Sequence, residues 1–496
     1  MQRYISSRDP AKAGVESHKA ILSGLAKDGG LYTPYPVDFY IDPERIRGKT
    51  YQEIALEIMS KFLDDYSREE LRSYISGAYD SKFDTQEIVP TREVPGMYLM
   101  ELWHGPTSAF KDLALTILPY LMSGAMRKSG DKKKVCILTA TSGDTGKAAL
   151  SGFADVKGTE ITVLYPEIGV SDIQKLQMQT SEGNNVYVLA VNGNFDDCQR
   201  IVKEFSTNGS VRNSFRNIDI SSANSINIGR LVPQIVYYFK SYSDLVSRGK
   251  IKCGDTVNFV VPTGNFGDIL AGYYAKYIGL PINRLVCASN SNHVLTDFFN
   301  TGIYSVDRPF HTTISPSMDI LISSNLERLL FSASHADTSL NLKMMNDLAE
   351  KKSYELPGRG IAKLQEIFSA YYATEDDCRY EIKRMWDRNH VLIDPHTAVA
   401  VHAAKLHREL TGDDSPAIVL STASPYKFSQ DVLKSLIGST PDNAFEAMEE
   451  LHEYTGVDIP ANLRNLKNKR VRFTKTVEVN EAEEALFSRL EDISNA

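Results

Sequence analysis

Short, wholly apolar runs alternate with amphipathic stretches from Val135 onward. We interpret the runs as buried strands, at 135–139, 161–165, 186–191, 257–261 and 418–421. The stretches between and after them have the helical period, at 147–156, 171–181, 195–205, 226–246, 268–278 and 395–410. Strands that are apolar along their whole length and separated by helices are typical of parallel sheets covered on both faces. The pattern therefore predicts an α/β fold.

The N-terminal part of the chain has a helical pattern instead. Residues 51–66 place their apolar positions on one helical face, and a Ser-x-x-Glu capping box then opens a second helix. Pro90 and Pro95 mark a boundary after these helices. We expect a helical N-terminal domain over residues 1–94 and an α/β domain over residues 95–496.

The α/β domain divides further by its pattern. We expect a smaller α/β subdomain at about 130–225 and a larger subdomain from the remainder. Residues 302–390 are polar, helix-rich and less regular, so we interpret them as an insertion. Residues after 438 predict a helical tail.

Composition and charge narrow the classes of protein. With 496 residues, of which 42% are hydrophobic and 24% charged, the chain has the composition of a soluble multidomain globular protein. Its net charge of -8 and the lack of a long basic run argue against nucleic-acid binding. No apolar run approaches the ~18 residues of a membrane span, and the first residues lack a signal-peptide core. Scattered cysteines without a Cys-x-x-Cys pair suit a reducing compartment, so we expect a cytoplasmic location.

The loops beyond the carboxyl ends of the strands carry the candidate chemistry, because ligands of open α/β sheets bind there. After 257–261 the loop contains Gly264-Asn265-Phe266-Gly267-Asp268, and a helix follows. Its glycines let the backbone approach an anion such as phosphate, and the N–H groups of a helix start would point toward it. A tight turn that needs positive φ explains the same glycines equally well.

Two other helix starts also carry groups that favour anions. The first follows 135–139 and suits a carboxylate through its hydroxyls and amides: Ser142, Gly143, Asp144 and Thr145. The second suits a phosphate monoester: Asn224, Ser225, Asn227 and Arg230. Helix capping is the alternative explanation for both, and for the first taken alone it is the favoured one. Thr422, just after 418–421, is by itself ordinary turn chemistry.

Lys111 follows a break in regular structure and a pair of apolar residues. Gly105 and Pro106 interrupt regular structure, and Ala109 and Phe110 lead directly into the lysine. An amine beside apolar groups loses hydration, which favours the free amine that a Schiff base needs. Taken alone, the stretch favours the alternative, a solvent-facing lysine before a helix at 113–122. Taken with the anion-type loops, it predicts a lysine-bound phosphorylated cofactor, and pyridoxal phosphate is bound in this way.

Four motifs, ordered along the chain, carry a resemblance to a known family. They are His104-Gly-Pro-Thr-Ser-Ala-Phe-Lys111-Asp112, Thr139-Ala-Thr-Ser-Gly-Asp-Thr-Gly146, Ser222-Ala-Asn-Ser-Ile-Asn227 and Pro262-Thr-Gly-Asn-Phe-Gly-Asp268. The sequence resembles the threonine synthases, and the similarity extends from Lys27 to near Lys427. The resemblance implies a fold-type-II pyridoxal-phosphate enzyme, in which two parallel-sheet subdomains hold the cofactor between them after a mainly helical N-terminal domain.

The resemblance also implies roles for individual residues. Lys111 would be the catalytic lysine that holds the cofactor, Thr422 would face the pyridine nitrogen, and Asp144 would approach the 3′-oxygen. A carboxylate near a phenolate repels it unless one of them carries a proton, so the protonation of Asp144 is left open. The cofactor phosphate would be held by Gly264, Asn265, Phe266, Gly267 and Asp268. The substrate would contact Ser142, Gly143, Thr145, Asn224, Ser225, Asn227 and Arg230.

The reaction implied by the resemblance converts O-phospho-L-homoserine and water to L-threonine and phosphate. It proceeds by γ-elimination and β-addition and is the last step of threonine biosynthesis. We expect a lyase that acts on this small molecule as a monomer or homodimer, without a metal, a membrane or nucleic acid.

Three other functions fit parts of the sequence. Another fold-type-II lyase, such as a threonine or serine dehydratase or an O-phosphohomoserine phospho-lyase, would use the same lysine, and product analysis separates it from a synthase. A metal-dependent hydrolase is suggested by four histidines close together in the sequence: His390, His396, His402 and His407. Residues five or six apart do not lie on the same face of a helix, however, so this spacing does not suit a metal site on a helix. A binding protein without activity is the third, and the retained Lys111 and cofactor loops argue against it.

Overall fold

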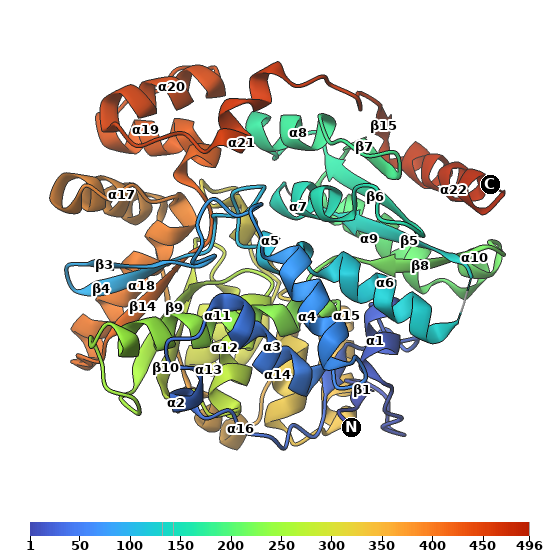
Figure 1. Ribbon diagram of the computed structural model, residues 1–496, viewed down its shortest axis with the longest axis horizontal. Helices are drawn as coiled ribbons and strands as arrows, with labels where there is room; N and C mark the ends of the chain where they lie inside the picture. The colour runs from blue at the N-terminus through green and yellow to red at the C-terminus, as the bar shows by residue number, and fades with distance from the viewer. Residues whose placement is uncertain (131, 142, 496) are drawn as a thin grey trace.

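The computed structural model describes residues 1–130, 132–141 and 143–495, and two sheets organise them (Figure 1). The larger has six strands in the order β13-β10-β9-β14-β4-β3, and the smaller has five in the order β15-β7-β6-β5-β8. All neighbouring strands are parallel except β3 and β4, which are antiparallel. The larger sheet is made of β3 (Thr91–Val94), β4 (Met97–Glu101), β9 (Val257–Pro262), β10 (Ile282–Ser289), β13 (Phe368–Tyr372) and β14 (Ala417–Ser421). The smaller sheet is made of β5 (Lys134–Ala140), β6 (Thr159–Pro166), β7 (Val186–Asn192), β8 (Ile218–Ser222) and β15 (Thr476–Glu478).

The elements predicted from the apolar pattern are confirmed. Each predicted strand is present, and the predicted helices are α7 (Asp144–Phe153), α8 (Asp172–Gln179), α9 (Phe195–Thr207), α11 (Ile228–Ser247), α12 (Gly267–Tyr277) and α18 (Pro395–Thr411). Local capping sets their first residues. Ser171 and Gln174 form a capping box at α8, and the Asp394 side chain accepts the N–H groups of His396 and Thr397 at α18.

The N-terminal residues contain the two predicted helices and a small two-stranded sheet that the pattern did not indicate. Helix α3 (Tyr51–Phe62) buries its apolar face, and a capping box of Ser67 and Glu70 opens α4 (Arg68–Ala78). Strands β1 (Tyr4–Ser6) and β2 (Tyr32–Pro34) pair antiparallel. The other helices here are α1 (Ser17–Ser23) and α2 (Pro43–Ile46).

The helix predicted at 113–122 is divided in two. Helix α5 (Asp112–Leu115) ends before Ile117, and α6 (Leu118–Ser129) starts there with Pro119 in its first turn. Proline lacks the N–H that a continuous helix would need, and it is well tolerated only in the first turn.

Strands occur in two regions predicted to be helical. In the predicted insertion, β13 extends the larger sheet, and in the predicted tail β15 pairs with β7 at the edge of the smaller one. The insertion also holds β11 (Ile303–Ser305), β12 (Ser353–Glu355), α14 (Leu326–Ala333), α15 (Thr338–Lys351), α16 (Gly358–Gln365) and α17 (Glu375–Asn389). After residue 428 lie α19 (Ser429–Ile437), α20 (Ala444–Thr455), α21 (Ala461–Arg464) and α22 (Val479–Asn495). The division into domains itself stays a prediction.

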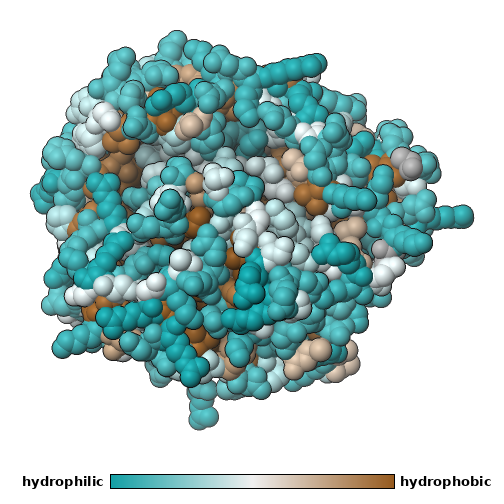
Figure 2. All heavy atoms as spheres, in the orientation of Figure 1, coloured by the Kyte–Doolittle hydropathy of each residue, from teal (hydrophilic) through white to brown (hydrophobic). Residues whose placement is uncertain are grey.

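Among the described residues, every helix is too short or too polar to cross a bilayer. On the face shown in Figure 2, apolar side chains appear in small groups among hydrophilic ones.

The smaller sheet depends on the C-terminal helix for part of its core. Leu486 and Leu490 of α22 are buried in one cluster with β5, β7 and α9. We expect Leu490→Ala to lower the free energy of unfolding by about 2–5 kcal/mol, because it removes buried methyl groups and leaves a cavity. Urea unfolding measures the change, and Glu491→Ala, an exposed neighbour, is the control. Equal stability of the two variants would contradict the packing of α22.

Candidate functional site

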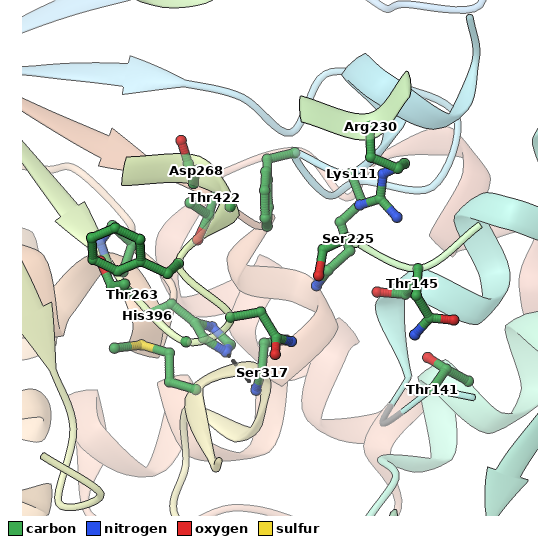
Figure 3. A pocket seen from close by; sticks show the side chains of 18 of the residues that line it. Lys111, Thr141, Thr145, Ser225, Arg230, Thr263, Asp268, Ser317, His396 and Thr422 are labelled. Carbon is green, nitrogen blue, oxygen red and sulfur yellow. Dashed lines mark hydrogen bonds between the residues drawn. The ribbon is translucent and has the colours of Figure 1, made fainter. Parts of the chain in front are cut away.

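The carboxyl ends of strands from the six-stranded and the five-stranded sheet lie around one cavity. It encloses about 830 Å³, counting its opening to solvent, and receives the residues that follow β5, β9 and β14. Most sequence-predicted site residues line it: Lys111, Thr145, Asn224, Ser225, Arg230, Gly264, Asn265, Phe266, Gly267, Asp268 and Thr422. Figure 3 shows Lys111 and Arg230 directed into the cavity, with Thr422 and Asp268 on another wall. Ser142 lies outside the described residues.

The loop that carries Lys111 is fastened to the loop after β14. The Phe110 N–H donates to the Thr422 carbonyl at 2.8 Å, and the Ser424 N–H donates to the Ser108 carbonyl at 3.1 Å. Within the Lys111 loop, Thr107 donates through its N–H and its hydroxyl to the Asp112 carboxylate, at 2.8 and 2.6 Å. These bonds fix the backbone on both sides of the lysine.

Lys111 is not a solvent-facing lysine. Its side chain is 12% exposed, and its Nζ lies 5.1 Å from the centre of the Phe110 ring and 3.6 Å from Asp144 Oδ2. Burial lowers the pKa of Lys111; Asp144 acts against this, and the positive charges of Lys427 and Arg230 add to it. The net direction favours the free amine, as the sequence predicted.

Asp144 opens α7 and is held by two elements besides the Lys111 loop. Its Oδ1 lies 2.5 Å from Nζ of Lys427 and accepts the Gln174 side-chain amide at 2.8 Å. Burial by itself would raise the pKa of Asp144, but the ammonium groups of Lys427 and Lys111 outweigh it and the pKa lies well below its usual range. The contact with Lys427 therefore favours the carboxylate form of Asp144.

The glycine loop before α12 offers donors for an anion. Phe266 has a left-handed backbone with φ of 63°, and within the described ranges the N–H groups of Gly264, Asn265 and Phe266 donate to no protein acceptor. The carbonyls are fixed instead, since Ser323 donates to Gly264 and Asn325 donates to Asn265. A Cβ at Gly264 would lie 2.8 Å from the Ser317 carbonyl oxygen, so only glycine fits.

The side chain of Asp268 has a structural role. Its carboxylate accepts hydrogen bonds from the hydroxyls of Tyr237 and Tyr238, at 2.5 and 2.9 Å, and burial raises its pKa to about 6. A carboxylate repels phosphate, so only the backbone of Asp268 could contribute to the phosphate contact predicted for it.

Arg230 is the main donor at the start of α11. Its Nη1 donates to the Ala223 carbonyl at 2.7 Å, whereas its buried Nε has no partner among the described residues. Burial lowers the pKa of Arg230 to about 10. Beside it, the Asn224 amide donates to the Ala140 carbonyl at 3.1 Å. A buried donor without an acceptor is costly, and an anionic ligand would satisfy it.

Two predicted substrate residues are not placed for that contact. Asn227 does not line the cavity; its amide donates to the carbonyls of Ile21 and Ser222, and its oxygen caps α11. Gly143 donates its N–H to the Thr141 hydroxyl at 2.9 Å. For Asn227 the capping alternative describes the observed contacts.

Several lining residues carried no sequence signal. His396, considered only as a metal ligand, donates from Nδ1 to Asp394 and accepts the Ser317 N–H on Nε2, at 2.7 and 3.1 Å. Gln234, Phe195 and Met318 also line the cavity. The described residues contain no cluster of three metal-ligating side chains.

Lys427 could have been noticed in the sequence as a lysine in the same loop as Thr422.

These residues fit pyridoxal phosphate. A buried lysine on an aromatic ring, a glycine loop whose N–H groups have no acceptor in the described part of the chain, and a hydroxyl at Thr422 match the aldehyde, the phosphate and the ring nitrogen of that cofactor.

Comparisons with protein families cover most of the chain. Residues 87–423 match the family of pyridoxal-phosphate dependent enzymes, residues 3–79 match the threonine synthase N terminus, and residues 397–486 match the threonine synthase C-terminal family.

Individual proteins agree with these families. The chain is 38% identical to a threonine synthase of Schizosaccharomyces pombe over 461 residues, which cover 86% of this chain and 88% of the relative. It is also 38% identical to human threonine synthase-like 1. The match covers 88% of this chain but only 61% of that longer relative. The structure of pyridoxal-phosphate-bound threonine synthase from Brucella melitensis superimposes with a TM-score of 0.87 at 33% identity, covering 100% of both chains. The predicted fold-type-II architecture and the family resemblance are thus confirmed, and the chain belongs to the threonine synthase family of pyridoxal-phosphate-dependent enzymes.

Proposed function

We propose that the protein is a threonine synthase, a lyase that converts O-phospho-L-homoserine and water to L-threonine and phosphate. One observation carries the proposal: two separate sets of anion donors line the cavity that contains Lys111. The loop before α12 suits the phosphate of the cofactor, and Arg230 at the start of α11 suits a second phosphate, that of the substrate.

When bound, pyridoxal phosphate supplies an electron sink for charge that develops on the substrate carbon skeleton. Lys111 would hold it, and the N–H groups of the glycine loop would bind its phosphate. The Thr422 hydroxyl is neutral, so it would leave the ring nitrogen largely without a proton.

Side chains of the cavity would then act on different atoms of the substrate. Lys111, whose pKa is lowered by burial, would act in its free-amine form, taking a proton from Cα and moving a second from Cβ. Arg230, with Asn224 and Ser225, would bind the phosphate and stabilise it as it leaves Cγ with the electrons of the C–O bond. Water then adds its hydroxyl at Cβ and gives its other proton to the released phosphate, while the two protons taken by Lys111 return to Cα and Cγ.

The wider expectations stay predictions. A small-molecule substrate suits the enclosed cavity, while the cytoplasmic location and the state as monomer or homodimer come from sequence reasoning alone.

Removal of Lys111 tests the catalytic proposal. We expect Lys111→Ala to lower kcat/KM for O-phospho-L-homoserine by more than about 10³-fold, because both the cofactor anchor and the proton carrier are lost. Phosphate release and threonine formation measure turnover, and borohydride reduction followed by peptide mass spectrometry locates the bound cofactor. Lys363→Ala, an exposed lysine, is the control. Full turnover by Lys111→Ala, or 2-oxobutanoate as the wild-type product, would contradict the proposal.

A second variant tests the substrate phosphate site. We expect Arg230→Gln to raise KM for O-phospho-L-homoserine by about 10-fold or more, because a charged hydrogen bond to the phosphate is lost. Affinity for pyridoxal phosphate, measured by absorption titration, should change little. Arg359→Gln, on an exposed arginine, controls for loss of charge. An unchanged KM in Arg230→Gln would remove this assignment.

A further inference from the structure

Lys427 is a buried lysine that the proposed reaction does not use. It follows β14 in the larger sheet, and its side chain is 0% exposed. Its Nζ lies 2.5 Å from Asp144 Oδ1 and donates to the Thr107 carbonyl at 3.1 Å. Lysines are rarely buried without a charged partner, so the ion pair with Asp144 explains its position.

The same carboxylate also faces Lys111, at 3.6 Å, so one buried anion lies between two lysines. A Lys111 that gives up its proton no longer neutralises Asp144. Without another cation, Asp144 would then be an unpaired charge with a side chain only 3% exposed. Lys427, with the Gln174 amide, satisfies Asp144 in that state.

We propose that Lys427 is the permanent counter-ion of Asp144, and that it thereby leaves Lys111 free to lose its proton and hold the cofactor. This makes Lys427 a positioning residue that acts through Asp144. The proposal rests on the role of Lys111 under the proposed function, but not on the identity of the substrate.

The charged groups around the pair agree with this role. Lys111 is faced by Asp144 from α7, Lys427 from the loop after β14, Arg230 from α11 and Asp268 from α12. Lys427 is also near Asp112 of α5 and Lys147 of α7. Removal of the Lys427 charge therefore leaves Asp144 to attract a proton to position 111, with Arg230 as the remaining opposing cation.

The test compares pH titrations of the visible absorption of the protein loaded with pyridoxal phosphate. We expect the midpoint in Lys427→Met to lie at least about one pH unit above that of the wild type, which is about tenfold in proton affinity. Lys427→Arg keeps the charge and should stay near the wild-type midpoint. Lys434→Met, on an exposed lysine of α19, is the matched control.

The outcomes separate this inference from the function on which it rests. A loaded Lys427→Met protein with the wild-type midpoint would overturn the role of Lys427 and leave Lys111 as the cofactor lysine. A wild-type protein that takes up no cofactor at Lys111 would overturn both.

A double variant keeps the test valid if Lys427→Met folds poorly. Lys427→Met with Asp144→Asn removes both charges, so we expect its thermal unfolding midpoint to be higher than that of Lys427→Met alone. A double variant that is no more stable than the single one would overturn the counter-ion role.

Discussion

The buried carboxylate of Asp144 connects the six-stranded and the five-stranded sheet at the site. Asp144 begins the helix that follows β5 of the smaller sheet, and it pairs with Lys427, which follows β14 of the larger one. Loss of one partner from a buried pair of this kind costs about 3–5 kcal/mol, because the remaining charge has no solvent. The Lys111 loop lies between the same two elements, so its geometry depends on this contact.

The cavity is built largely from backbone that is held by side chains farther out. Ser323 and Asn325 fix the carbonyls of the glycine loop, and within the described residues its N–H groups stay available for a ligand. Asp394 and His396 hold the Ser317 backbone in the same wall. Such supporting bonds position donors before a ligand arrives, so that little ordering remains to be done on binding.

Electrostatics in the cavity favour phosphate and a free amine together. Burial lowers the pKa of Lys111, and the positive charges of Lys427 and Arg230 lower it further and attract anionic groups. Asp144 balances Lys427, and Asp268 is shielded by two tyrosine hydroxyls. The same positive charges thus favour both the free amine of Lys111 and the binding of anionic groups.

The sequence by itself determined the strands and helices of the α/β body and the glycine loop, because apolar period, caps and glycine spacing are local. The Lys111 motif and three others carried the resemblance to the family. It did not indicate β13 or β15, since short edge strands are specified by the sheet they join. Only the tertiary structure decided that the Asn227 amide binds the Ile21 carbonyl, that Asp268 is held by tyrosines, and that Lys427 meets Asp144. These contacts join residues distant in sequence, and burial, which sets their charges, exists only in the folded chain.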